Sequence, residues 1–133
     1  MKLIKFLVMI QEDKKLLLQD LCGRIPYGVK MNHIADTENN PITLVGVAKT
    51  MITLESSAGY GTSDIEDYIP YLFPISSMTE EQKVDMIKSS CGIGSDKNVF
   101  DWFNKNHFDY RGLIEKGLAI DATGTDIYAI PEE

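Results

Sequence analysis

The sequence predicts a single α+β domain in which a small antiparallel sheet carries three to four helices packed on one face. Three observations support this fold class. The chain has 133 residues, which is a usual size for one domain. Short β-rich segments gather in the first half of the chain, and segments with helix start and stop signals dominate the second half. We expect one domain over residues 1–133, with 131–133 as a frayed acidic tail.

The chain is expected to begin its folded part with a helix and a strand. Residues 12–22 carry an apolar stripe with acids at the start, and Gly23 is typical of a helix end. Pro26 and Gly28 predict a turn. Residues 29–34 then alternate between apolar and polar side chains, which indicates a strand.

Two further strands are expected at 42–47 and 50–54, because both segments are rich in β-forming residues. Ala48–Lys49 suits a tight connection, so we expect a small antiparallel meander. Residues 55–63 predict a loop, since two glycines flank Tyr60. Two interpretations stay open: a mobile surface loop, or a binding loop with an aromatic tip.

The middle of the chain combines a proline-rich segment with a strong helix signal. Residues 64–71 predict a short helix that a proline stops, and 72–75 form an apolar segment expected to lie across the core. Thr79 and Gln82 have the spacing of a capping box, which predicts a helix that continues to about Ser89.

The last third of the chain predicts two helices and an extended end. Residues 96–106 carry an aromatic stripe at helical spacing. A short helix is expected at 109–116, ended by Gly117. Residues 118–120 and 127–130 flank a polar turn and indicate strands or an extended tail.

The charge of the chain argues against nucleic-acid binding. Thirteen Lys and Arg stand against 20 Asp and Glu, for a net charge of -7. Residues 1–66 hold eight acids and seven bases, and residues 67–133 hold twelve acids and six bases, so -6 of the charge lies in the second half. Arg24 and Arg111 are the only arginines. Binding through phosphates needs clustered basic residues, so we expect no nucleic-acid partner.

The cysteines and histidines predict no metal site and no cofactor. Cys22 and Cys91 lie far apart and share no CxxC spacing, and neither His33 nor His107 is placed with ligand spacing. We expect reduced thiols in a cytosolic protein, with one long-range disulfide as the alternative.

No membrane partner is expected. The apolar run at residues 6–10 is shorter than the apolar region of a signal peptide. No run approaches the roughly 20 residues that span a bilayer. We therefore expect a cytoplasmic location, with residues 1–11 forming a first strand or a helix lead-in.

The segment 106–112 holds the densest set of reactive side chains. His107 is a candidate general base if a carboxylate orients it, and Arg111 is a candidate ligand for a phosphate or carboxylate. The structural alternative is a corner between two helices, where Asp109 caps, Tyr110 packs and Arg111 bonds a carbonyl or an acid. We favour the structural alternative, and we identify no catalytic residues.

A second small group, Arg24 and Tyr27, lies at the turn around Pro26. A Pro-Gly turn with Tyr27 packed is the simpler interpretation. A shared pocket would require this turn to meet the segment 107–111. The candidate ligand-binding or interaction residues are therefore Arg24, Tyr27, His107, Asp109, Tyr110 and Arg111.

Three stretches of the sequence, at 13–29, 68–81 and 102–118, together resemble a family of small proteins from Bacteroides-type gut bacteria and their phages. The resemblance covers about residues 12–120. The function of that family is not known, so the resemblance implies a cytosolic or phage-linked context and no site residue. It also implies that residues 1–11 are a variable leader.

Two functions of different classes follow from these observations. The first is a non-enzymatic cytosolic interaction protein of phage or mobile-element origin that binds a host protein. The alternative is a small-molecule binding protein for an anionic metabolite or a nucleotide. An enzyme built on His107 is the third and weakest hypothesis, and the sequence leaves a homo-oligomer open.

Overall fold

A seven-stranded, mostly antiparallel sheet and three α-helices make up the described part of the computed structural model, which comprises residues 10–36, 40–89 and 95–128. The strand order is β4-β3-β2-β1-β5-β6, and β7 also pairs with β5. The strands are β1 (Lys30–His33), β2 (Ile42–Ala48), β3 (Met51–Ser56), β4 (Gly59–Asp64), β5 (Tyr68–Pro74), β6 (Phe108–Asp109) and β7 (Ile120–Asp121). The helices are α2 (Gln11–Arg24), α3 (Glu80–Ser89) and α4 (Ser95–Lys105), with 3-10 turns η1 (Ile25–Tyr27), η2 (Ile65–Asp67) and η3 (Ile75–Ser77).

The predicted antiparallel meander is confirmed, and it is larger than expected. Strands β1 to β4 pair in chain order, and Lys49 makes the tight connection from β2 to β3 with a φ of 57°. Strand β5 then joins the other side of β1. Strands β6 and β7 pair with β5 in parallel over two residues each. The α+β class therefore stands, with a wider sheet than the sequence predicted.

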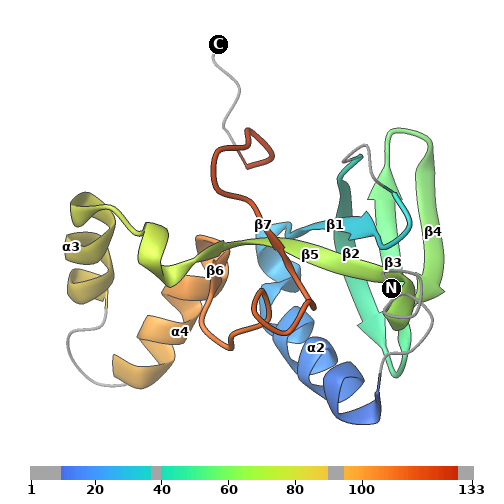
Figure 1. Ribbon diagram of the computed structural model, residues 1–133, viewed down its shortest axis with the longest axis horizontal. Helices are drawn as coiled ribbons and strands as arrows, with labels where there is room; N and C mark the ends of the chain where they lie inside the picture. Colours follow the sequence, from blue (N-terminus) through green and yellow to red (C-terminus); the bar gives the residue numbers. More distant parts are fainter. Residues whose placement is uncertain (1–9, 37–39, 90–94, 129–133) are drawn as a thin grey trace.

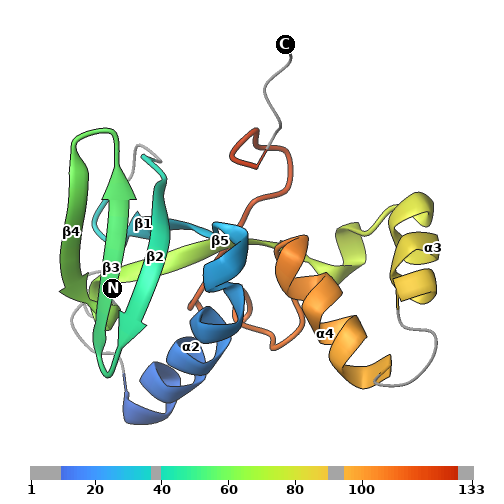
Figure 2. The ribbon, with the colours of Figure 1, turned by 180° about the vertical axis from the view of Figure 1, so that it is seen from behind.

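Helices α2 and α4 pack on the sheet. In α2, Leu17 and Leu21 are fully buried in one core cluster with residues of β2 and β3, including Leu44 and Ile52. Helix α4 lies next to α2 and packs on β6, and α3 lies beyond α4 at the far end of the molecule (Figures 1 and 2). The expectation that all helices cover one face of the sheet is therefore wrong for α3, which packs on α4.

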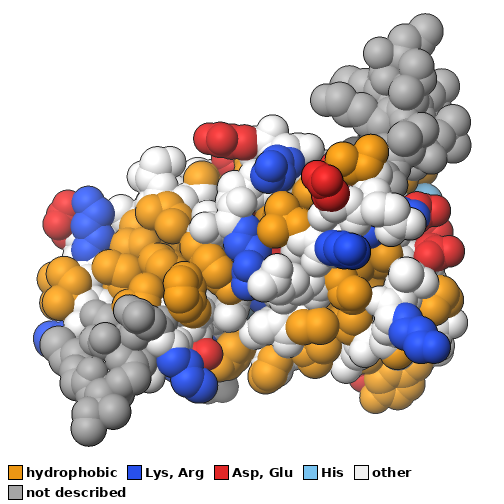
Figure 3. Space-filling model, turned by 90° about the horizontal axis from the view of Figure 1, so that it is seen from below, with side chains coloured by type: hydrophobic (Ala, Val, Ile, Leu, Met, Phe, Trp, Pro, Cys, Tyr) orange, Lys and Arg blue, Asp and Glu red, His pale blue; other side chains and the backbone are white. Residues whose placement is uncertain are grey.

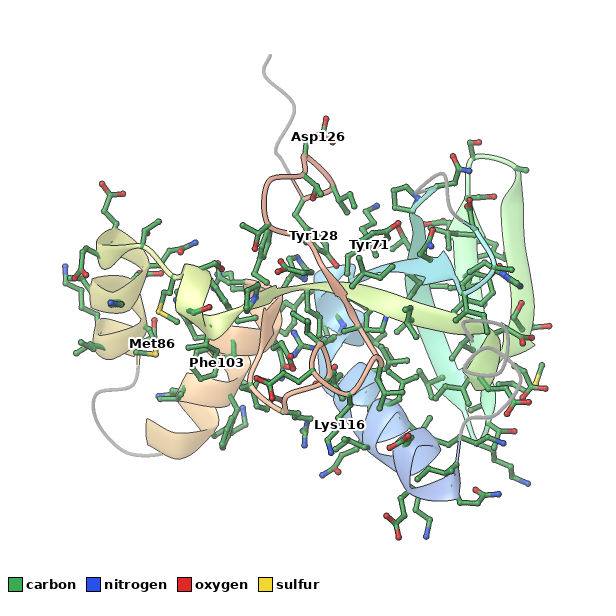
Figure 4. The ribbon with its side chains drawn as sticks, in the orientation of Figure 1. Tyr71, Met86, Phe103, Lys116, Asp126 and Tyr128 are labelled. Carbon is green, nitrogen blue, oxygen red and sulfur yellow. The ribbon has the colours of Figure 1, made fainter. Side chains whose placement is uncertain are left out.

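A second core forms where α3 and α4 meet the end of β5. Met78, Trp102, Phe103 and Phe108 are its buried members. Met86 of α3 packs against them, and it faces Phe103 across the gap between the two helices (Figure 4). Strand β5 runs from the first core to the second, because Leu72 belongs to the first and Phe73 packs on the second.

The predicted loop at 55–63 is wrong. Strand β3 continues to Ser56, and a turn at 57–58 leads into β4. The hairpin pairs in unbroken register from Ser56 and Gly59 to Met51 and Asp64. Because β4 forms the edge of the sheet and its side chains are mostly exposed, its backbone pairing with β3 is its main connection to the sheet. A strand that is exposed and contains two glycines lacks the alternation of apolar and polar residues from which a strand is predicted.

The predicted helix at 64–71 is also wrong. Only Ile65–Asp67 form a single 3-10 turn, and the chain then enters β5. Pro70 cannot donate a backbone hydrogen bond inside a helix, whereas it fits the extended backbone opposite Met31 of β1. The expectation that 72–75 lies across the core holds for β5, where Tyr71 and Leu72 are buried.

Two helix ends differ from expectation as well. Helix α2 continues through Gly23 to Arg24, so Gly23 does not stop it. Residues 109–116 form turns instead of a helix, because Gly112 and Gly117 adopt left-handed φ angles of 75° and 76° on either side of a single turn. The amide of Leu118 closes that turn by donating to the carbonyl of Leu113 at 2.9 Å.

Most other predicted elements are confirmed with shifts of one or two residues, whereas 127–128 form a turn and not a strand. Residues 12–22, 29–34 and 96–106 correspond to α2, β1 and α4. The capping box is formed: the Thr79 amide donates to Gln82 Oε1 at 2.8 Å, and the Gln82 amide donates to Thr79 Oγ1 at 3.1 Å. Residues 129–130 of the last predicted segment lie outside the described residues.

The capping box generates a first prediction. Thr79→Ala removes the hydroxyl that accepts from the Gln82 amide at the start of α3 and keeps the backbone amide of residue 79, so we expect the free energy of unfolding to fall by about 1 kcal/mol. Urea unfolding followed by circular dichroism measures this loss. Thr123→Ala, at an exposed turn position, is the matched control and should change stability by less than about 0.5 kcal/mol. Equal effects of the two substitutions would show that the box contributes nothing.

Candidate functional site

A buried ion pair on α2 organises the candidate site. Asp20 and Arg24 lie one helical turn apart, and both side chains are 0% exposed. Arg24 Nε donates to Asp20 Oδ2 at 2.7 Å, and Arg24 Nη2 donates to Asp20 Oδ1 at 3.1 Å. The pair is therefore bidentate, which is the strongest geometry between these groups.

The same guanidinium joins α2 to the second core. Arg24 Nη2 also donates to the backbone carbonyl of Phe108 at 2.6 Å, and Phe108 belongs to β6. The remaining nitrogen, Nη1, is buried and finds no hydrogen-bond partner within the described residues. Arg24 therefore has a structural role, because it links α2 to β6. It was predicted as a ligand-binding residue, but its side chain is fully buried.

Arg111 approaches the same carboxylate from the other side. Its Nε donates to Asp20 Oδ1 at 3.2 Å, so one carboxylate serves two arginines. The Tyr110 ring lies against both guanidinium groups, 5.4 Å from Arg24 and 4.9 Å from Arg111. A cation over a ring face is attracted by the π electrons. The predicted convergence of Arg24, Tyr110 and Arg111 is thus seen, around an acid that the sequence analysis did not select.

Asp109 holds the backbone that carries Tyr110 and Arg111. Its Oδ1 accepts from the amides of Arg111 at 3.3 Å and Leu113 at 2.9 Å. Its Oδ2 accepts from the amide of Ile114 at 2.9 Å. The capping alternative is the one that the structure supports. Since both carboxylate oxygens are used in this way, Asp109 is not the group that orients His107 as a base.

A cavity opens beside Arg111. It has a volume of about 560 Å³ and lies between α2, α4 and the segment 110–111. Its lining residues are Gln19, Gly23, Phe100, Asn104, Tyr110 and Arg111. Seen from below, hydrophobic side chains gather on the half of the molecule that holds α3 and α4, with basic side chains at their border (Figure 3). This volume lies within the range of small-molecule sites in proteins.

Asn104 places a polar group in the wall of this cavity. The residue is 5% exposed, and its Oδ1 has no hydrogen-bond partner in the described part of the chain. Helix α2 passes close by at Gly23, where a Cβ atom would come within 2.9 Å of Asn104 Nδ2. Glycine at this position therefore leaves room for the amide.

His107 lies in a different environment. Its ring stacks on Tyr128 with centroids 3.7 Å apart, and its Nδ1 is buried with no partner in the described residues. Tyr128 is itself held by the carbonyl of Tyr71, to which its hydroxyl donates at 2.7 Å (Figure 4). Burial, together with the charges of Arg24 and Lys30, lowers the pKa of His107 to about 4. The imidazole is therefore neutral near pH 7.

The six residues predicted from the sequence do not share one pocket. His107 lines a cavity of about 450 Å³ with Phe73 and Tyr128. Tyr27 lines another of about 350 Å³ with Trp102. The predicted shared pocket is therefore wrong for these two residues and for the buried Arg24.

The sequence analysis missed Asp20 and Asn104. Asp20 had a detectable signal, because Asp20 and Arg24 have the i,i+4 spacing of an ion pair and share a helix face with Leu17 and Leu21. The predicted stripe instead included Cys22, which is an exposed free cysteine, and Cys91 lies outside the described residues. Asn104 continues the aromatic stripe of α4 after Phe100, which was the only signal in the sequence.

Other site types find no counterpart in the described ranges. No cluster of three or more His, Cys, Asp or Glu side chains there is arranged to hold a metal ion. None of the helices there has the length and apolar composition needed to cross a bilayer. Comparison of the chain with family models, curated proteins and solved structures finds no match. The resemblance to the Bacteroides and phage family therefore stays a prediction.

The buried pair generates a second prediction. Arg24→Met leaves Asp20 buried with one of its three hydrogen bonds, so we expect the free energy of unfolding to fall by about 3–5 kcal/mol. The double substitution Asp20→Leu/Arg24→Met should cost less than the sum of its single substitutions, because neither charge is then left alone. Chemical denaturation of the three variants measures the coupling.

The control for this prediction is an exposed pair with the same spacing. Lys97 and Asp101 lie 2.8 Å apart at i,i+4, with side chains 80% and 45% exposed. Lys97→Met should change stability by less than about 0.5 kcal/mol. If Arg24→Met costs no more than Lys97→Met, the buried pair does not hold the two cores together.

His107 generates a third prediction, on pH. The pKa of His107 is about 6.5 in the unfolded chain and about 4 in the folded chain. The folded state therefore binds fewer protons in this interval. Stability is complete above about pH 6.5 and falls by roughly 3 kcal/mol as the pH drops to 4.

Unfolding curves of the wild type and of His107→Asn between pH 7 and 4 test this dependence. Asn tolerates the left-handed φ of 63° at this position, so the variant keeps the backbone and loses the titration. We expect a shallower slope for His107→Asn. Thr123→Ala, at an exposed position without a titratable group, should keep the wild-type slope. Identical slopes for all three proteins would contradict the assignment.

Proposed function

We propose that this chain binds a small anionic molecule in the cavity beside Arg111. One observation carries the proposal: two guanidinium groups share the single carboxylate of Asp20. The side chains of Asp20, Arg24 and Arg111 alone therefore hold one positive charge in excess, because the neighbouring carboxylate of Asp109 is bonded to backbone amides and to neither guanidinium. An anion in the cavity would complete this charge balance.

Arg111 is the residue suited to meet the anion. Its side chain is 24% exposed, whereas Arg24 is fully buried. The contacts of Arg111 with Asp20 and with the Tyr110 hydroxyl use Nε and Nη2, so Nη1 is directed elsewhere. A charge-assisted bond at a partly buried guanidinium is stronger than one in open water.

The contacts around Arg111 also favour binding by limiting its motion. Asp20 fixes the guanidinium, the Tyr110 ring lies against it, and Asp109 fixes the backbone. A side chain that is ordered before binding loses less conformational entropy when the ligand arrives. The proposed ligand class includes small carboxylates and phosphates.

Binding to a host protein is the second candidate function. It is favoured by three hydrophobic side chains exposed on α3 and α4, namely Val84, Ile87 and Phe100. Exposed hydrophobic groups are typical of interaction surfaces when they form a patch. Recovery of a stoichiometric partner from lysate by the wild type, and its loss in Val84→Asp, would favour this candidate.

Anion binding generates the fourth prediction. We expect acetate, benzoate or phosphate at millimolar concentrations to raise the melting temperature and to give saturable binding by calorimetry. Arg111→Met should reduce that affinity at least tenfold. This variant keeps the Asp20–Arg24 pair, so we expect it to fold.

The matched control is Lys116→Met. Lys116 is an exposed cation in the neighbouring turn and does not line the cavity (Figure 4). Its replacement removes the same charge and should leave the affinity unchanged. If both substitutions weaken binding equally, only the net charge matters and the proposed site is wrong.

A further inference from the structure

The cavity beside Arg111 has aromatic walls. Phe100 is 49% exposed, and its ring centroid lies 5.2 Å from that of Tyr110 at an interplanar angle of 38°. Tyr110 in turn stacks on Phe103 at 5.6 Å and 24°. This row of rings behind the cavity offers an apolar surface, on which a ring of the ligand can pack.

Arg111 lies at the edge of this aromatic surface. Its guanidinium is 4.9 Å from the centre of the Tyr110 ring. A carboxylate bound to Arg111 therefore has an aromatic ring beside it, and a flat group attached to that carboxylate can pack toward Phe100. Acetate and phosphate would use the cation and leave the rings uncovered.

Asn104 indicates that the ligand also carries a hydrogen-bond donor. The residue lines the same cavity as Arg111, and its Oδ1 is a buried acceptor without a donor in the described residues. A buried polar atom without a partner is unfavourable. The missing Cβ at Gly23 leaves room for this amide where α2 passes α4.

From these three features we infer that the ligand is an aromatic carboxylate that carries an amino or hydroxyl donor. The carboxylate binds Arg111, the ring packs on Phe100 and Tyr110, and the donor bonds Asn104 Oδ1. This inference rests on the proposed function, since it names the class of anion bound at the same cavity.

Calorimetry with a panel of small anions tests the inference. The panel contains phosphate, cyclohexanecarboxylate, benzoate, and the three aminobenzoates and three hydroxybenzoates. We expect benzoate to bind at least threefold more tightly than cyclohexanecarboxylate, because only a flat ring stacks. We expect at least one of the amino or hydroxy isomers to bind about tenfold more tightly than benzoate.

Two variants assign the contacts. Asn104→Leu keeps a similar volume and removes the acceptor, so it should abolish the advantage of the preferred isomer over benzoate. Phe100→Ala should weaken the binding of benzoate more than that of phosphate. The exposed position of Phe100 makes this variant safe for folding, and near-ultraviolet circular dichroism of both variants checks the core.

The outcomes separate this inference from the proposed function. Equal affinities for aromatic and aliphatic carboxylates, with dependence on Arg111 retained, would overturn the aromatic class and leave anion binding standing. An isomer preference that survives in Asn104→Leu would overturn the role of Asn104, as expected if bound water satisfies it. Absence of Arg111-dependent binding across the panel would overturn the proposed function itself.

Discussion

The carboxylate of Asp20 is the contact on which the rest of the structure depends. It is fully buried, and a buried carboxylate is tolerated only when cations and hydrogen bonds compensate its lost hydration. Arg24 supplies two of these bonds and Arg111 supplies a third. Because Arg24 also bonds the carbonyl of Phe108, the group links α2, β6 and the segment 110–111. The two hydrophobic cores are thus joined through a polar network.

The network also explains why a site would lie at this place. One carboxylate between two guanidinium groups leaves an excess of donors, and the excess lies at a cavity. Arg24 is buried behind the network and serves structure, whereas Arg111 is the member that reaches the cavity. Ordering Arg111 and leaving Asn104 Oδ1 without a partner both cost stability in the free protein. Such costs are typical of binding sites, because a bound molecule recovers them.

Local signals were sufficient to predict some elements and not others. The capping box at Thr79 and the apolar stripe of α2 are short-range patterns, and both gave the correct helices. Strand β4 has mostly exposed side chains, so it carries no hydrophobic pattern, and β5 contains prolines, which are typical of the end of an element. The candidate site could be predicted only in part, because only some of its residues are close in the sequence. The reactive segment 107–111 was visible in the sequence, but its partners lie on α2 and α4 and are brought together only by the fold.

The two arginines provide the most direct measurement of this account. Because the chain contains only Arg24 and Arg111, a proton–nitrogen spectrum of the arginine Nε–H groups holds two signals, which Arg111→Met assigns. The account predicts that both signals are slow to exchange with water, since both Nε–H groups bond Asp20. Titration with benzoate should move the Arg111 signal saturably and the Arg24 signal little. Two rapidly exchanging signals, or an Arg111 signal that no anion moves, would contradict the account.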